Sequence, residues 1–187
     1  MKGTHSKLLA LASRRRLSVP ALSVLALVLL LLAAGATSVG AKEQERPVPF
    51  RATYSAIQTV TVDPLRCPVL TVNAEGGGEA THLGQFASVQ SHCIDPDGSD
   101  PLSFTEGFYT FTAANGDTIF GSYGGRLIPT ETLGVFGLDG HFTIAGGTGR
   151  FEGASGGGSA SGLVNLVTGE ASVFLQGTIS SVGSSKL

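Results

Sequence analysis

One glycine-rich run constrains the fold of this chain more than any other segment. Residues 146–156 read Gly-Gly-Thr-Gly-Arg-Phe-Glu-Gly-Ala-Ser-Gly, with five glycines around a single aromatic residue, Phe151. Glycine reaches backbone angles that other residues avoid, so such a run is typical of a tight, sterically demanding connection. We expect Gly146, Gly147 and Gly149 to shape this turn, and we expect Phe151 to fix it to a core.

The run has β-type sequence on both sides, and several segments of the chain alternate between apolar and polar residues, as a strand with one buried face does. The clearest case begins with Phe50, Ala52 and Tyr54, which are separated by polar residues. The Asn-Gly pair at 115–116 is a strong signal for a hairpin turn. We predict eight strands, at residues 50–62, 69–74, 81–94, 102–112, 118–128, 133–144, 154–166 and 170–181.

The glycine content also favours an all-β protein. Glycine supplies 24 of the 146 residues that follow position 41, against a usual share of about 7%. A sheet of eight twisted antiparallel strands tends to close on itself, because closure removes exposed edges. We therefore predict an eight-stranded antiparallel β-barrel, with a two-sheet sandwich as the alternative. A barrel of this size is filled by its own side chains or holds one small ligand.

The first part of the chain has the composition of a signal peptide. Basic residues precede a largely apolar stretch from Leu17 to Ala36, and small residues close it at Ala41. We predict a cleavable signal peptide at residues 1–41, a flexible arm at 42–49 and a single barrel domain at 50–187. Cleavage after Ala36 is a near-equal alternative, and an uncleaved segment of about 20 apolar residues could instead anchor the protein in a membrane. The predicted location is secreted or extracytoplasmic.

Export would change the charge of the protein. Beyond position 41 the chain has 7 basic and 14 acidic residues, a net charge of −7 compared with −2 for the whole sequence. No basic patch is left, which argues against nucleic acid and against anionic membrane surfaces as partners. Contact with a membrane is expected only through an uncleaved signal segment.

Both cysteines of the chain, Cys67 and Cys93, follow the predicted signal peptide. In an oxidising compartment two such residues usually pair. We place a hairpin turn at 75–79, which would bring the two cysteines opposite each other at the far end of the hairpin. Closing a loop of this length should stabilise the fold by about 3 kcal/mol on the chain-entropy estimate. We predict a structural disulfide rather than a reactive thiol.

Three segments together resemble a known family. They are Thr-His-Leu-Gly at 81–84, Ala-Asn-Gly-Asp at 114–117 and the glycine-rich run at 146–156. In this order and spacing they resemble exported bacterial proteins of the allene oxide cyclase barrel superfamily, which includes the plant dirigent proteins. The resemblance spans residues 50–181, and its Gly-Gly-Thr-Gly-Arg-Phe part is the most specific.

This resemblance implies an eight-stranded antiparallel barrel that is often a homo-oligomer in relatives. It also implies a central cavity for a small apolar or phenolic molecule. Plant members of the superfamily either cyclise a fatty-acid epoxide or direct the radical coupling of phenols. No catalytic residue of those members is carried over onto this sequence.

Glu106 is the first candidate for contact with a ligand. It shares strand parity with Phe104 and Phe108. If that face points inward, a carboxylate enters an apolar cavity, where burial would raise its pKa and make it a proton donor or acceptor. If Tyr109 and Phe111 mark the inner face instead, Glu106 is solvated.

Tyr54 is the second candidate. It lies on the apolar side of the first predicted strand, so its ring could line a cavity while its hydroxyl anchors a ligand. The alternative is a core tyrosine whose hydroxyl is satisfied by the protein. Arg126 is expected in water near the barrel rim.

The sequence predicts no metal site and no cofactor. His82, His92 and His141 lack the close spacing of metal ligands, and we expect them at the surface or at strand edges. The glycine-rich run is not followed by the helix and the Lys-Ser/Thr pair of a phosphate-binding loop. No arrangement typical of a serine hydrolase is present.

Three functional hypotheses remain. The first is an exported barrel that binds a small apolar or phenolic molecule without catalysis. The second is a cyclase or isomerase acting on an unsaturated or oxidised lipid, with Glu106 as the proton-transfer residue. The third is a non-catalytic structural protein that assembles through the barrel exterior, because Phe108 and Tyr109 would place apolar side chains on both faces of one strand.

Overall fold

The computed structural model describes residues 46–94 and 98–180. They belong to one compact unit, Gln44–Leu187. The predicted signal peptide at 1–41 and the first part of the predicted arm lie outside the described residues. Within the described ranges, no helix combines the length and the hydrophobicity needed to cross a lipid bilayer.

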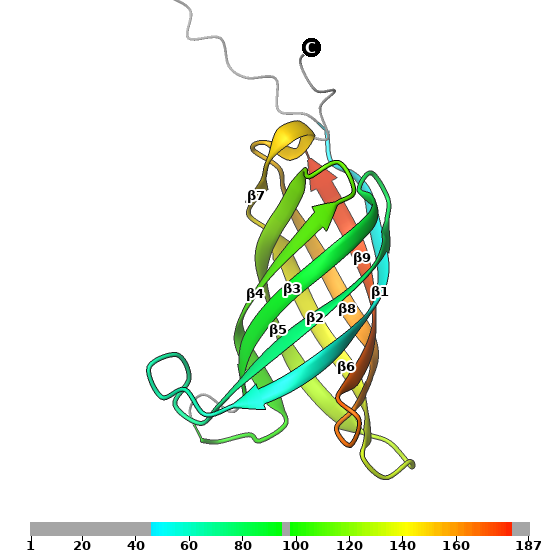
Figure 1. The fold of residues 1–187 in the computed structure, drawn as a ribbon. Coiled ribbons are helices and arrows are strands. Elements are labelled where there is room, and N and C mark those ends of the chain that lie inside the picture. The colour runs from blue at the N-terminus through cyan, green and yellow to red at the C-terminus, as the bar shows by residue number, and fades with distance from the viewer. Residues whose placement is uncertain (1–45, 95–97, 181–187) are drawn as a thin grey trace, which may run out of the picture. The chain divides into compact units, whose positions relative to one another are not determined.

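The described part of the chain is almost entirely strand (Figure 1). The elements in order are β1 (Val48–Thr61), β2 (Leu70–Ala80), β3 (Gly84–Ile94), β4 (Ser103–Ala113), β5 (Thr118–Pro129), β6 (Val135–Ile144), β7 (Gly146–Gly147), the 3-10 helix η2 (Gly149–Phe151), β8 (Ser155–Asn165) and β9 (Glu170–Ser180). Strand β1 pairs with β2 on one side and with β9 on the other, and β4 pairs with β5. All pairs are antiparallel, so the eight long strands form a closed barrel. The predicted barrel is confirmed and the sandwich alternative is wrong.

The barrel begins two residues before the predicted boundary. Val48 pairs with Ile179 and Pro49 with Thr178, both in β9. These pairs extend the seam between the first and last strands, so the end of the predicted arm is part of the sheet.

The predicted turn at 75–79 is wrong, because these residues lie inside β2. Gly76 pairs with Ala56 of β1. A Cβ atom at Gly76 would collide with the carbonyl oxygen of Ser55, so glycine at this position permits a close approach of two strands rather than a reversal of the chain. The turn between β2 and β3 is at 81–83.

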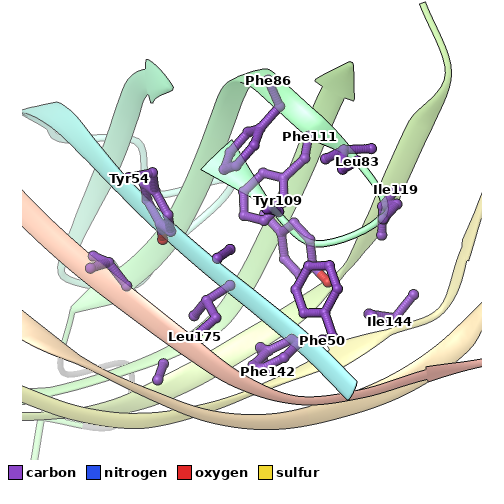
Figure 2. Packing of buried hydrophobic residues seen from close by; sticks show 14 of the residues in the cluster. Phe50, Tyr54, Leu83, Phe86, Tyr109, Phe111, Ile119, Phe142, Ile144 and Leu175 are labelled. Atoms are coloured by element: carbon purple, nitrogen blue, oxygen red, sulfur yellow. The ribbon is translucent and has the colours of Figure 1, made fainter. Parts of the chain in front are cut away.

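One end of the barrel, which we call the plugged end, carries the loops 81–83, 114–117 and 148–154. Its interior is filled by large apolar side chains that are almost completely buried: Phe50, Leu83, Ile119, Ile144, Phe151 and Ile179. Figure 2 shows Leu83, Ile119 and Ile144 gathered on one side of Phe50. The interior of this end is therefore filled by side chains of the core.

The glycine-rich run crosses the plugged end. Phe151 is completely buried. Gly149 has a φ of 59°, and a Cβ atom there would collide with the carboxylate of Asp117. The Arg150 guanidinium lies over the Phe151 ring, with its central carbon 5.0 Å from the ring centre, and its Nε is 3.6 Å from Asp117 Oδ2. An aromatic anchor and an ion pair thus hold the turn on the barrel.

Candidate functional site

The other end of the barrel, which we call the mouth, leads into a cavity. It carries the loops 62–69, 98–102, 130–134 and 166–169. The cavity has a volume of about 290 Å³, and all eight long strands contribute to its lining. Val60 and Leu166 belong to this lining and are more than half exposed to solvent. The cavity therefore opens at the mouth, and none of the six core residues of the plugged end lines it.

Small inward side chains create this space. Ala56, Ala74, Ala160 and Ala171 line the cavity from β1, β2, β8 and β9. All four are buried, so they point into the barrel at positions where a larger side chain would fill the hollow.

The cavity has one aromatic wall and one aliphatic wall. Rings from β1, β4 and β5 form the aromatic wall, with centroid distances of 5.5 Å for Tyr54 and Phe111 and 4.7 Å for Tyr109 and Phe111. These separations are typical of tilted aromatic pairs. The aliphatic wall comes from β8 and β9 and consists of Ala160, Val164, Ala171, Val173 and Leu175.

Two hydrogen-bonded pairs interrupt this apolar lining. The Tyr54 hydroxyl donates to Gln90 Oε1 at 3.2 Å, and Gln90 Nε2 donates to Ser88 Oγ at 3.4 Å. The Nδ1 atom of His92 lies 2.8 Å from the Tyr123 hydroxyl, and the tautomer of the imidazole decides which group donates. Tyr54, Gln90, His92 and Tyr123 are thus polar groups of the lining, which also includes Gln58, Tyr109 and His141.

The groups of these two hydrogen-bonded pairs are uncharged at neutral pH, and burial moves the pKa values of the titratable ones further from 7. Burial, with a smaller effect of the Arg66 charge, lowers the pKa of His92 from 6.5 to about 4. Burial raises the pKa of Tyr54 to about 12, although its hydrogen bond to Gln90 acts in the opposite direction. Burial also raises the pKa of Tyr123 well above its usual value. The cavity therefore offers neutral donors and acceptors rather than a charged partner.

The described lining of the cavity contains no Asp, Glu, Lys or Arg. A charged group that entered it would lose its hydration without gaining an opposite charge, which is strongly unfavourable. The electrostatics of the cavity thus favour a neutral guest.

Of the two alternatives for Glu106, the structure supports the second: Tyr109 and Phe111 mark the inner face, and Glu106 lies outside the cavity. Its side chain is 58% exposed and forms an ion pair with Arg66, with 3.1 Å between Nη1 and Oε2. One extra residue in β4 relative to both neighbouring strands causes this placement. Between Phe104 and Gly107 the chain advances three residues, while β5 advances two. This β-bulge changes the strand parity, so Phe104 and Tyr109 both point inward.

Tyr54 lies where the sequence placed it, on the inner face of β1. Its ring lines the cavity, and its hydroxyl is satisfied by Gln90. The Arg126 side chain is 63% exposed and pairs with Asp100 at 3.4 Å, so it remains at the barrel rim.

His92 and Tyr123 were missed as site residues. The expectation of a surface or edge position for His92 is wrong, because this residue is buried and lines the cavity. The sequence signal that could have identified His92 is its position in β3. Every second residue of that strand from Phe86 to His92 is buried: Phe86, Ser88, Gln90 and His92. His82 and His141 are exposed. Within 46–94 and 98–180 no cluster of three or more side chains is suited to hold a metal ion.

The disulfide between Cys67 and Cys93 is present, with a Cα–Cα distance of 5.3 Å, and confirms the predicted pairing. It ties the loop 62–69 to β3. Arg66 adds a second attachment, because its Nη1 atom lies 3.1 Å from both Cys93 Sγ and Glu106 Oε2. This loop of the mouth is therefore fixed at its base.

The comparisons with known proteins bear on the fold. No protein-family model and no curated protein matches this sequence. Among solved structures, the fold is similar to that of the pterocarpan synthase dirigent protein GePTS1, with a TM-score of 0.53 and 12% sequence identity. The match covers 78% of this chain and 91% of the other chain. At this identity the similarity establishes a dirigent-like barrel fold and nothing about activity.

Proposed function

We propose that this protein is exported and binds one small, neutral, aromatic or phenolic molecule in its barrel. The observation that carries the proposal is the cavity, which is apolar, uncharged and open at the mouth. Its buried polar groups include the hydrogen-bonded pairs of Tyr54 with Gln90 and of His92 with Tyr123. A single hydroxyl or carbonyl on the guest would find a hydrogen-bond partner among them.

The size of the cavity supports a guest with one or two rings. An apolar cavity of about 150 Å³ is large enough for benzene. The volume here is about 290 Å³, at the lower limit of pockets for drug-sized molecules. The aromatic wall also provides ring faces and edges against which a flat guest can pack.

The absence of charged side chains from the described lining favours a phenol over a fatty acid as the guest. A phenol is neutral at pH 7 and needs only a hydrogen-bond partner, whereas a fatty acid carries a carboxylate. No described lysine or arginine lines the cavity to pair with that carboxylate. The cost of burying an unpaired charge therefore disfavours an ionised lipid.

Binding without catalysis is the function that we favour over a cyclase or isomerase. The cyclase hypothesis assigned proton transfer to Glu106, which lies outside the cavity. His92 faces the cavity, but its pKa of about 4 makes it a weak base at neutral pH. The export part of the proposal draws support from the disulfide, since such bonds persist in oxidising compartments.

Three related compounds test the charge and size of the guest: naphthalene, 2-naphthol and 2-naphthoate. The measurement is the thermal midpoint of unfolding with each compound. We expect 2-naphthol to raise it most, naphthalene to raise it less and 2-naphthoate to leave it unchanged. Equal shifts for 2-naphthoate and 2-naphthol, or no shift with any compound, would overturn the proposal.

Substitution Ala160→Leu tests the position of the guest. Ala160 lines the cavity, so the larger side chain should fill it, abolish 2-naphthol binding and stabilise the free protein by about 0.5–2 kcal/mol. The matched control is Ser161→Leu on the next, outward position of β8, which should bind 2-naphthol normally. Isothermal titration calorimetry and urea unfolding provide the two measurements.

A further inference from the structure

The most exposed large apolar side chains of the described residues lie in the loops of the mouth. Leu65 is 99% exposed, Leu133 98%, Val167 80% and Val62 78%. We call these four side chains the apolar tips. On the barrel wall no large apolar residue is more than 60% exposed, so the tips are distinct from the ordinary outer surface of the strands.

The plugged end provides an internal comparison. Its loops 81–83, 114–117 and 148–154 contain no exposed large apolar side chain within the described residues. Exposed apolar residues are therefore a property of the mouth and not of the loops of this barrel in general. The tips are therefore a feature of one end of the barrel, next to the opening of an apolar cavity.

The tips come from three separate loops that surround the opening of the cavity. Figure 1 shows these loops at the lower end of the barrel, where they project beyond the strands and the loop 62–69 lies apart from the other two. The loops 130–134 and 166–169 are joined by a hydrogen bond from the Leu166 amide to the Gly134 carbonyl at 2.8 Å. The loop with Leu65 is held by the disulfide of Cys67. The loops that carry the tips are thus held in place by a hydrogen bond and by the disulfide.

We propose that the mouth docks on a lipid bilayer and that the apolar tips insert into it. The tips are separate side chains that project from the barrel. A bilayer can accommodate them because its lipids are fluid and rearrange around each inserted side chain. A protein partner or a second copy of this chain would need a matching pocket for each of them. The side chains at the entrance of the cavity, Val60 and Leu166, are also apolar and exposed, so the docked surface would continue into the cavity.

The charged side chains near the mouth determine which lipid headgroup charge the docked surface would prefer. Arg66 pairs with Glu106, and Arg126 pairs with Asp100. Each of these cations is therefore already matched by a carboxylate, while Asp63 and Glu131 lie in the same loops as Leu65 and Leu133. This acidic surface would be repelled by anionic lipid, so the preferred surface is uncharged overall, as in phosphatidylcholine.

Docking would let a guest pass between the bilayer and the cavity without crossing water. This consequence depends on the proposed small-molecule binding, but the docking itself does not. A variant that has lost 2-naphthol binding, such as Ala160→Leu, should therefore still dock on vesicles. The two proposals can fail separately.

The first test measures binding of the exported protein to phosphatidylcholine vesicles by cosedimentation. The double substitution Leu65→Ser and Leu133→Ser should reduce the partition coefficient by about tenfold or more, because two inserted side chains are lost. The matched control is Leu163→Ser on the barrel wall, which is 53% exposed and should leave the partition unchanged. Equal binding of the double variant and the unmodified protein would overturn the proposal. Replacing part of the phosphatidylcholine by phosphatidylglycerol should weaken binding.

The second test reports on one loop and is independent of any N-terminal anchor. Both native cysteines form the disulfide, so a polarity-sensitive dye can be attached to a single new thiol in Leu133→Cys. Its emission should shift to the blue on phosphatidylcholine vesicles, whereas the dye in Asn115→Cys, at the plugged end, should not respond. An unchanged emission at position 133 would contradict docking. A response that appears without vesicles and follows protein concentration would identify a second copy as the partner instead.

Discussion

The two ends of this barrel are built from the same eight strands but distribute apolar side chains in opposite ways. At the plugged end the large residues Phe50, Ile119 and Phe151 point inward, and the loops outside are polar or glycine-rich. Around the cavity, which opens at the mouth, inward positions on β1, β2, β8 and β9 include alanines such as Ala160 and Ala171, and large apolar side chains lie exposed on the mouth loops. One end therefore holds a packed core that stabilises the barrel, while the other has an open cavity and exposed apolar side chains.

The largest expected effect comes from truncating one apolar residue at each end of the barrel, which tests whether only the plugged end stabilises the fold. Phe151→Ala should lower the free energy of unfolding by about 3–5 kcal/mol, because it removes a completely buried ring and leaves a cavity. Leu133→Ala at the mouth should change it by no more than about 0.5 kcal/mol, because that side chain already lies in solvent. Urea unfolding of both variants measures the difference. Similar losses would show that the mouth also carries part of the core.

The pH dependence of the free energy of unfolding tests the burial of His92 in the cavity lining. The pKa of His92 is lowered from 6.5 to about 4 in the folded protein, so below pH 6.5 the unfolded chain binds a proton that the folded chain does not. The stability from this residue is complete above pH 6.5 and is lost as the pH falls toward 4. Between pH 7 and pH 5 the free energy of unfolding should fall by about 2 kcal/mol through this residue.

The control for that measurement is His92→Gln, which keeps a hydrogen-bonding side chain at the Tyr123 hydroxyl but does not titrate. Carboxylates titrate in both proteins, so the informative quantity is the difference between their unfolding free energies at each pH. If the two proteins lose the same stability between pH 7 and pH 5, His92 is not a buried neutral imidazole.

The smallest expected effect concerns Glu106. Its carboxylate is largely exposed and pairs with Arg66 on the outside of the barrel. Glu106→Gln should therefore change the free energy of unfolding by less than about 1 kcal/mol and leave 2-naphthol binding unaltered in calorimetry. A marked loss of binding would place this carboxylate in contact with the guest after all.

Local sequence patterns predicted much of the fold. Alternation in Phe50, Ala52 and Tyr54 identified both the first strand and its buried face. The two cysteines predicted their own pairing. The glycines of 76–78 misled the prediction, since a glycine run can mark a turn or a close approach of strands, and only the neighbouring strand distinguishes the two cases.

The candidate site was less predictable, for a related reason. Strand parity assigns a side chain to a face only while the register is regular, and the bulge between Phe104 and Gly107 interrupts it. Parity therefore left two positions open for Glu106, and the bulge places it outside. His92 was accessible to the same parity argument along β3, but its pairing with Tyr123 joins residues from two strands that are not adjacent in the barrel.

Alternation and turn chemistry act over a few residues, so local patterns were enough to predict an all-β chain, most of its strand positions, its disulfide and a closed barrel. Only the tertiary structure decided which end is filled, which is hollow and which polar groups face the cavity. Those properties depend on the sum of side-chain volumes around a closed ring of strands and on one extra residue in β4. Neither quantity can be read from a single segment of the chain.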